Sequence, residues 1–294
     1  MDLIYPILTT IRSSGLSRYP DCPRRWAAQS LRREIEEAGH VLGIPRETIA
    51  GPIGSAVHAG AAALLKAKMD GSYVGLSDAT DAALAELDGL VADVDIFYDP
   101  ETAPTIPVAR RQVARMLHAY ARQIVPQVDP IVVEERLEAN CCWDSDGNPS
   151  LLLSGQCDNL CRSPSGLRDI KTGGKAGARA NHKPQVGSYS LLFRSHGIDV
   201  NEVLIDVIPR VAITTPQPPV VTTTYNVAAC ETAARRIIDH ISRDLSLFRE
   251  GDLDLRRIEA GDPWAFVANP SSMMCNQKWC PAHGTDFCSE YTRI

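Results

Sequence analysis

The chain has 294 residues, of which 44% are hydrophobic and 22% charged, as in ordinary globular proteins. No apolar run reaches the roughly 18 residues that span a bilayer, and the net charge of −6 argues mildly against nucleic-acid binding, although an acidic protein can carry a local basic patch. The start of the chain lacks a signal-peptide pattern, so we expect a cytoplasmic protein. Nine cysteines in that compartment indicate metal ligation rather than disulfides.

The pattern along the chain predicts helices first and strands later. Helices are expected over residues 22–38, 52–69, 78–93 and 107–125, with a proline-marked loop over 95–107. Strands are expected over 130–141, 150–163 and 167–172, followed by a helix over 184–196, strands within 200–211 and 218–227, and a helix over 227–250. We therefore expect one α/β domain over 1–294: a helical part (1–126), a core with a mixed sheet (127–250) and a cysteine-rich segment (262–294).

Two acids and a lysine lie close together in the predicted hairpin. Asp158 is in the second strand, and Asp169 and Lys171 lie two apart in the third, so these two share a face. Carboxylates suit Mg²⁺ or Mn²⁺, which activates water and polarises a phosphoryl oxygen. A lysine beside the ion can position the water and offset charge on the phosphate. Alone, however, an Asp-x-Lys triplet is usually a surface charge pair.

The surrounding motifs favour the metal site. G-x-x-D, a hairpin and D-x-K follow in the order that resembles the PD-(D/E)XK nuclease superfamily, specifically its RecB-like branch. Gln185 and Tyr189 continue the match as Q-x-x-x-Y, and His58 resembles the histidine of an upstream helix. The resemblance implies a restriction-endonuclease-like core, with a mixed sheet flanked by helices, an N-terminal helical layer and a C-terminal metal-cluster segment stapled to the N-terminus.

The resemblance also implies a role for each residue. Four groups would be metal ligands: His58, Asp158, Asp169 and the main-chain carbonyl of Ile170. Lys171 would be the catalytic lysine, with Gln185 and Tyr189 supporting the site or contacting the DNA backbone. Glu134 in the first strand matches an assisting acid, and Glu135 is the alternative because the register is uncertain by one residue. Taken singly, His58 and Tyr189 would be ordinary packed residues.

A basic stretch surrounds the D-x-K triplet. Residues 162–183 hold six lysines and arginines against one acid, and two adjacent glycines follow Lys171. We expect Lys175, Arg179 and Lys183, with His182, to contact a DNA backbone without reading bases. A solvated loop is the alternative, and the Walker A pattern is absent.

Four cysteines form a separate pattern. Cys22, in "CPRRW", and the C-terminal trio Cys275, Cys280 and Cys288 resemble the iron–sulfur nucleases of the same branch, which include CRISPR-associated, AddB-type and phage exonucleases. The resemblance implies a [4Fe–4S] cluster that joins the ends of the chain. The spacings are loose, so Zn²⁺ is an alternative, with His283 as a replacement ligand. The other five are expected to be buried apolar residues: Cys141, Cys142, Cys157, Cys161 and Cys230. Arg24 and Arg25 would face DNA or solvent.

The function implied is a Mg²⁺- or Mn²⁺-dependent deoxyribonuclease, and we expect an exonuclease of DNA processing, recombination or repair, in a bacterium or a phage-infected cell. The alternative is a catalytically inactive, nuclease-like scaffold that binds DNA or a recombination protein. The expected partner is DNA, together with a helicase, an annealing protein or a CRISPR adaptation protein, and without a membrane. Oligomeric state, digestion polarity and strand preference stay open.

Overall fold

The computed structural model describes residues 8–45, 47–93, 96–97, 104–163, 166–173, 181–252 and 258–291. The helices are α1 (Ser13–Leu16), α2 (Pro23–Ser30), α3 (Arg32–Glu37), α4 (Ala50–Met69), α5 (Leu76–Asp93), α6 (Ile106–Gln123), α7 (Lys183–Ser195) and α8 (Val227–Glu250), with 3-10 turns η1 (Val125–Gln127), η3 (Pro263–Ala265) and η4 (Asp286–Tyr291). The strands are β1 (Thr9–Arg12), β2 (Glu47–Thr48), β3 (Ile96–Phe97), β4 (Asp129–Trp143), β5 (Pro149–Ser163), β6 (Gly166–Gly173), β7 (Val203–Pro209) and β8 (Val221–Tyr225).

The main sheet is mixed, as the sequence predicts, and β5 is its central strand. β4 pairs with β5 antiparallel along one edge. On the other edge, β1 pairs parallel with residues 151–154 and β6 pairs antiparallel with residues 159–161. β7 then lies parallel to β6, and β8 is antiparallel to β7. The parallel pair requires a crossover, which α7 provides.

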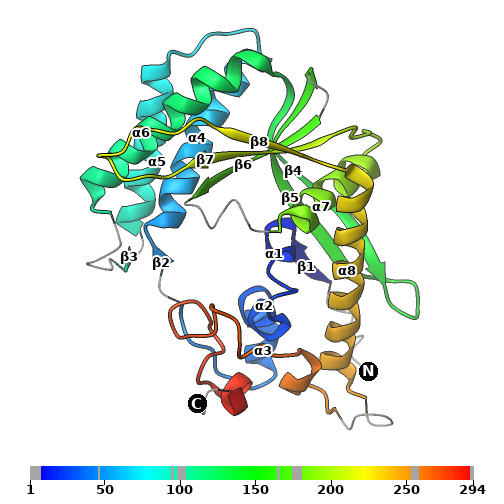
Figure 1. Cartoon of the computed structure of the whole chain (residues 1–294). Coiled ribbons are helices and arrows are strands. Elements are labelled where there is room, and N and C mark those ends of the chain that lie inside the picture. The colour runs from blue at the N-terminus through cyan, green and yellow to red at the C-terminus, as the bar shows by residue number, and fades with distance from the viewer. Residues whose placement is uncertain are drawn as a thin grey trace.

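Helices cover both faces of this sheet (Figure 1). On one face, α4 packs against α5 and α6, and the alanines and glycines of α4 allow close contact: a Cβ on Gly60 would lie 2.5 Å from Leu117 Cδ2. Their core reaches the sheet at Ile170 and Ile208. On the other face, α7 packs through a core that includes Phe193. The two layers hold the sheet between them, as in other α/β folds.

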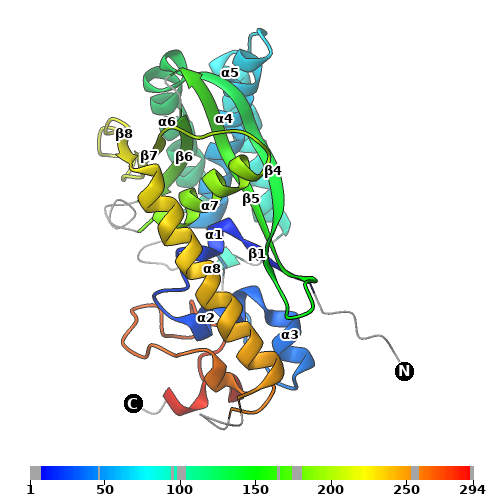
Figure 2. The same cartoon turned by 90° about the vertical axis from the view of Figure 1, so that its right-hand side faces the viewer.

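A third core joins the two ends of the chain. α8 runs from the sheet to α2, α3 and the C-terminal segment, which lie side by side at the end of the molecule away from α5 and α6 (Figures 1 and 2). Trp26, Phe248, Phe266 and Phe287 are buried there. The ring centroids of Phe248 and Phe266 are 5.5 Å apart. Large aromatic side chains therefore fix the C-terminal segment, which has little regular structure, onto the first helices.

Three features differ from the expected elements. The helix expected over 22–38 is broken at the buried Leu31, whose φ of −117° and ψ of 25° are not helical, so that α2 and α3 can both pack on the third core. β1 was not expected, and it is too short to show a clear alternation. β3 pairs with β2 inside the expected loop. None of the helices in the described ranges is long and apolar enough to cross a membrane.

Candidate active site

The candidate site lies where β5 is without a strand partner on one edge. Among the described residues, β1 pairing stops at Ser154 and β6 pairing begins at Asn159, which leaves residues 155–158 open on that edge. α1 and α7 close in on the gap: a Cβ on Gly155 would lie 2.4 Å from Ser13 Oγ and 2.9 Å from Tyr189 Cδ1. Only glycine fits this approach, which explains the glycine of G-x-x-D.

Asp158 lies at the end of the gap, and its side chain forms hydrogen bonds where strand pairing is absent. Its Oδ2 accepts a hydrogen bond from the backbone N–H of Ile170 in β6, and its Oδ1 lies 2.9 Å from His58 Nδ1 on α4. The Ile170 side chain packs in the core beneath α4. One buried carboxylate thus links two strands and a helix.

Glu134 lies opposite Asp158 on β4, between the pairs Val133–Asn159 and Glu135–Cys157. Its φ of +53° is left-handed, and it is the one non-glycine residue with positive φ in the described chain. This conformation costs about 1–2 kcal/mol for a residue with a Cβ. The side chain comes within 3.9 Å of His58 Nδ1 and accepts a hydrogen bond from Gln156 Nε2 at 2.6 Å. Glu135 is exposed, so the acid at the site is Glu134.

His58, Glu134 and Asp158 form a compact donor set. One ligand atom of each lies within 4.8 Å of the others. Burial opposes charge on His58, but the carboxylates of Asp158, Asp169 and Glu134 outweigh it and raise the pKa of His58 to about 9. Burial is also the main cause that raises the pKa of Glu134. Two carboxylates and an imidazole suit a small divalent cation, which would replace the histidine proton.

A second chain of contacts runs on the α7 side. Lys171 and Asp169 share a face as expected: Lys171 Nζ lies 2.7 Å from Asp169 Oδ2 and donates to Gln185 Oε1 at 3.0 Å. Gln185 Nε2 donates to the Tyr189 hydroxyl at 2.9 Å, one helical turn away. Burial raises the pKa of Asp169 to about 6 and raises that of Tyr189. Asp169 is therefore the partner of Lys171 in this structure, rather than a member of the compact donor set.

The basic stretch is only partly described. Lys175 and Arg179 lie outside the described residues. Lys183 is exposed at the first residue of α7, and His182 precedes it. An exposed cation at this position is available to a phosphate.

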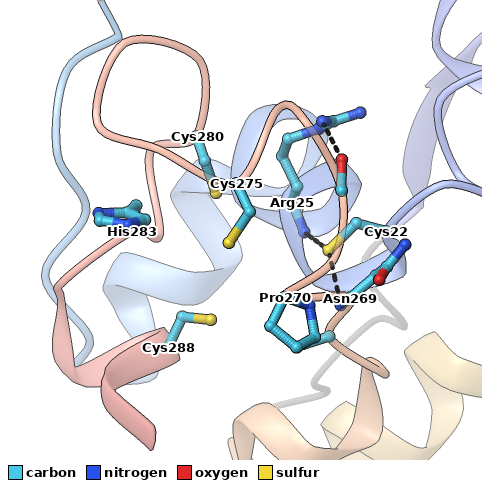
Figure 3. Close-up of a pocket in the computed structure, with 10 residues that line it drawn as sticks. Cys22, Arg25, Asn269, Pro270, Cys275, Cys280, His283 and Cys288 are labelled. Atoms are coloured by element: carbon cyan, nitrogen blue, oxygen red, sulfur yellow. Dashed lines mark hydrogen bonds between the residues drawn. The ribbon is translucent and has the colours of Figure 1, made fainter. Parts of the chain in front are cut away.

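Four cysteines from the two ends of the chain line one cavity. Cys22, Cys275, Cys280 and Cys288 gather around a common space, with His283 beside them (Figure 3). None of the four forms a disulfide. Among the described residues, no three cysteine sulfurs lie within 4.8 Å of one another. Cys22 caps α2, and its sulfur accepts hydrogen bonds from Arg25 N and Asn269 N, both at 3.4 Å.

The arginines beside Cys22 correct an expectation. Arg24 and Arg25 are 2% and 6% exposed, so they face neither DNA nor solvent. Arg24 Nε donates to the Phe266 carbonyl at 3.0 Å, and Arg25 pairs with Asp21 at 2.8 Å. Arg25 Nη1 also donates to Ser272 Oγ at 3.4 Å, so both arginines hold the C-terminal segment beside α2. Periodicity gave no signal for this, because both partners lie in segments without a repeating pattern.

The other cysteines follow the expectation only in part. Cys157, Cys161 and Cys230 are buried, whereas Cys141 and Cys142 are only half-buried. A register shift in β4 after Asn140 places both of these neighbours against the third core. The expectation was wrong for this pair because the bulge interrupts the alternation of faces.

The comparisons with known proteins bear on the family and the fold of the chain. A model described as the PD-(D/E)XK nuclease superfamily matches residues 13–285. Among solved structures, a proposed exonuclease from Eubacterium rectale is 10% identical, with a TM-score of 0.51 over 80% of each chain. At that identity the likeness shows the fold alone.

Two further solved structures are more distant. SSO0001 is 14% identical, with a TM-score of 0.35 over 81% of this chain and 79% of its own. LHK-Exo in complex with dAMP is 13% identical, with a TM-score of 0.30 over 66% of this chain and 94% of its own. No curated protein matches the chain.

Proposed function

The chain belongs to the PD-(D/E)XK nuclease superfamily, and on that premise we propose that it hydrolyses phosphodiester bonds in DNA with Mg²⁺ or Mn²⁺, as an exonuclease. One observation carries the proposal. The donor set of His58 on α4, Glu134 on β4 and Asp158 on β5 lies beside the ion pair of Lys171 and Asp169 on β6. A divalent ion can supply an activated water, and a lysine beside it can stabilise the charge that develops on the phosphate during hydrolysis.

We propose His58, Glu134 and Asp158 as metal ligands, with Asp169 and the Ile170 carbonyl completing the site when DNA and metal are bound. The donor chemistry supports Mg²⁺ or Mn²⁺, because four of these five groups offer oxygen. A bound cation would supply an activated water and neutralise charge on the phosphate. The carboxylate of Asp158 is held in place by hydrogen bonds with the Ile170 N–H and with His58.

Lys171 is the proposed catalytic lysine. Asp169 forms an ion pair with its ammonium at 2.7 Å, and Gln185 accepts a hydrogen bond from it on the other side. Gln185 in turn is held by Tyr189. The ammonium is thereby directed at the edge of the site, where it would position the attacking water and stabilise the developing charge on the phosphate. Gln185 and Tyr189 are positioning residues in this scheme, since their contacts act through Lys171.

The proposed substrate is linear DNA. Lys183 is exposed at the start of α7, two residues before Gln185 and six before Tyr189, so a backbone phosphate there would lie near the site. We propose that Lys175 and Arg179 extend this basic track. Contacts of this kind neutralise phosphates without selecting sequence.

The decisive experiment is hydrolysis of end-labelled linear and closed circular DNA with Mg²⁺ or Mn²⁺. The wild type should degrade the linear form, Lys171→Ala should not, and Lys68→Ala, an exposed lysine on α4, should match the wild type. Equal activity of the wild type and Lys171→Ala would contradict the catalytic assignment. A protein inert on every DNA form and with either metal would instead be the inactive scaffold.

We further propose that the four cysteines hold a [4Fe–4S] cluster. A tetrahedral Zn²⁺ site with bonds of about 2.3 Å places its sulfurs about 3.8 Å apart, and here no three sulfurs among the described cysteines come within 4.8 Å. A cubane has one iron at each of four corners, so its thiolates lie further apart. His283 is a neighbour of the cavity in this proposal, not a ligand.

Metal analysis tests the cluster. Protein purified without oxygen should contain iron and acid-labile sulfide in equal amounts and should absorb broadly near 400 nm. Zinc without sulfide would reject the cluster in favour of the four-thiolate zinc site. The result is independent of the nuclease assay, because it needs no DNA.

A further inference from the structure

A second cavity continues the sheet face on which Lys171 lies. In the β6–β7 register Lys171 is opposite Val207, and in the β7–β8 register Val207 is opposite Val221. Residues side by side on neighbouring strands share a face, so the two valines extend the row that begins at Lys171. Both line a cavity of about 530 Å³, which we call the β7–β8 pocket. The pocket also includes Gly173, two residues after Lys171, so it adjoins the candidate site.

The walls of the β7–β8 pocket suit a planar, largely apolar group. Besides the two valines, Ile205, Pro209 and Pro218 line it, together with the ring of Tyr225. Its volume falls within the range of about 300–1,000 Å³ that is typical of small-molecule sites. An aromatic ring beside branched aliphatic side chains is a surface on which a nucleobase can stack, and such stacking tolerates any base.

Arg210 adds a charge to this apolar pocket. It is half-buried and lines the cavity. Within the described ranges no carboxylate and no hydrogen-bond acceptor pairs with its guanidinium, and burial alone lowers its pKa. The nearby Asp206 is already paired with Arg168. A half-buried arginine without a carboxylate is suited to a phosphate, which it can bind through two parallel N–H groups.

We propose that the β7–β8 pocket receives the nucleotide that adjoins the scissile phosphate, with its base against Val207, Val221 and Tyr225 and its phosphate at Arg210. The proposal rests on the proposed nuclease function, which brings a DNA strand to Lys171, and deepens it by assigning a site for one nucleotide. Arg210 would bind the phosphate of this nucleotide at the DNA end. The apolar walls would bind its base, so that the enzyme requires a base at that position.

Binding of small probes tests the pocket without any cleavage. Isothermal titration of metal-free protein would compare dTMP with thymidine, which lacks the phosphate, and with 2-deoxyribose 5-phosphate, which lacks the base. We expect dTMP to bind at least tenfold more tightly than either fragment. Arg210→Gln should weaken dTMP binding about 10- to 100-fold, the usual effect of losing hydrogen bonds to a charged group. Val221→Trp, at a position 53% exposed on β8, should fill the pocket and block binding.

The control is Arg236→Gln, which removes an exposed arginine from α8 and should bind dTMP like the wild type. If dTMP fails to bind the wild type, or binds equally to all four proteins, the pocket assignment is overturned. In the cleavage assay, Arg210→Gln should raise KM with a maximal rate within about threefold of the wild type, as expected for lost ground-state binding. Should the wild type bind dTMP at Arg210 yet cleave no DNA, the nuclease proposal fails and the nucleotide site stands.

Discussion

Arg168 and Asp206 form a two-pronged ion pair between β6 and β7: Nε lies 2.9 Å from Oδ2, and Nη2 lies 2.8 Å from Oδ1. Both side chains are buried, and Thr222 on β8 adds a hydrogen bond of 2.6 Å to Asp206. The pair thus connects three strands on the α4 side of the sheet, one residue away from Asp169. It is structural, since both charges are buried and each has the other as its partner.

Removing one member of this pair should destabilise the protein strongly. We expect Asp206→Ala to lower the free energy of unfolding by about 3–5 kcal/mol, because Arg168 is left as an unpaired buried charge. Urea unfolding followed by circular dichroism measures the change. The double variant Arg168→Met/Asp206→Leu should recover most of the loss. A loss below about 1 kcal/mol in the single variant would show that solvent reaches the pair.

Lys171 and Gln185 contact one another beside Asp169. Variants of the two residues should distinguish a loss of the catalytic group from a loss of its positioning. Lys171→Ala is expected to reduce DNA hydrolysis by at least about 100-fold, without a change in the melting temperature beyond a few degrees. Gln185→Ala should cost about 10- to 100-fold, since the lysine loses a charge-assisted hydrogen bond. In the double variant the losses should not add, because Gln185 acts through Lys171. Additive losses would mean that Gln185 has its own contact with DNA.

His58 predicts a pH dependence of stability in the metal-free protein. Its pKa is about 9 in the folded protein and 6.5 in its ordinary state. Because the folded state holds the proton more tightly, the stabilisation is complete below pH 6.5 and is lost as the pH rises through about 9. Asp169, with a pKa of about 6, stays ionised over most of this window.

Unfolding measured between pH 6 and 10 should show this decrease, and His58→Gln should flatten it. Saturating Mn²⁺ should flatten it as well, since a cation takes the place of the proton. A wild-type curve that matches His58→Gln throughout the range would contradict the assignment of the histidine proton.

The left-handed backbone of Glu134 gives a comparison of two truncations. Glycine adopts a φ of +53° without strain, whereas alanine does not. Glu134→Gly should therefore be more stable than Glu134→Ala by about 1 kcal/mol, the opposite of the usual order inside a strand. Both variants lose the carboxylate and should bind Mn²⁺ more weakly than the wild type. Equal stability of the two would show that the strand relaxes when the side chain is removed.

The cysteine cavity predicts a link between cofactor content and stability. Cys280→Ala should lose most of the bound iron and unfold at a temperature several degrees lower, because metal binding contributes folding free energy. Cys142→Ala is the matched control, since this half-buried cysteine lies outside the cavity. Iron analysis and differential scanning calorimetry provide the two readouts. Retention of iron in Cys280→Ala would transfer the ligand role to another group, with His283 as the first candidate.

The sequence was informative where a pattern repeats or a motif has fixed order. The alternation in β6 correctly placed Asp169 and Lys171 on one face, and the helices expected over 52–69 and 227–250 match α4 and α8 within a few residues. Alternation failed on β5. Cys157 and Leu160 lie in the same core. In a regular strand, residues three positions apart would face opposite sides of the sheet, so the strand is irregular around Asp158. An irregular strand has no period from which its side-chain directions can be read.

Other parts of the site depend on contacts distant in sequence. The gap on β5 exists because β1 stops at Arg12 and α1 begins at Ser13, and four residues of strand are too few to predict. The choice of Glu134 over Glu135 follows from a left-handed residue, which glutamate rarely adopts. The burial of Arg24 depends on Phe266, 242 residues later. Such features become visible only when the chain is folded.

The cysteine cavity also imposes an order on biosynthesis. The ribosome releases Cys22 before the strands of the site, and the other three thiols of the cavity follow after them, at Cys275, Cys280 and Cys288. The strands of the site, from β4 to β7, are complete before any of these three is made. A chain that stops before Cys275 therefore carries every proposed catalytic residue but only one of the four thiols. A cofactor that needs all four thiolates can therefore be bound only after Cys288 has been synthesised.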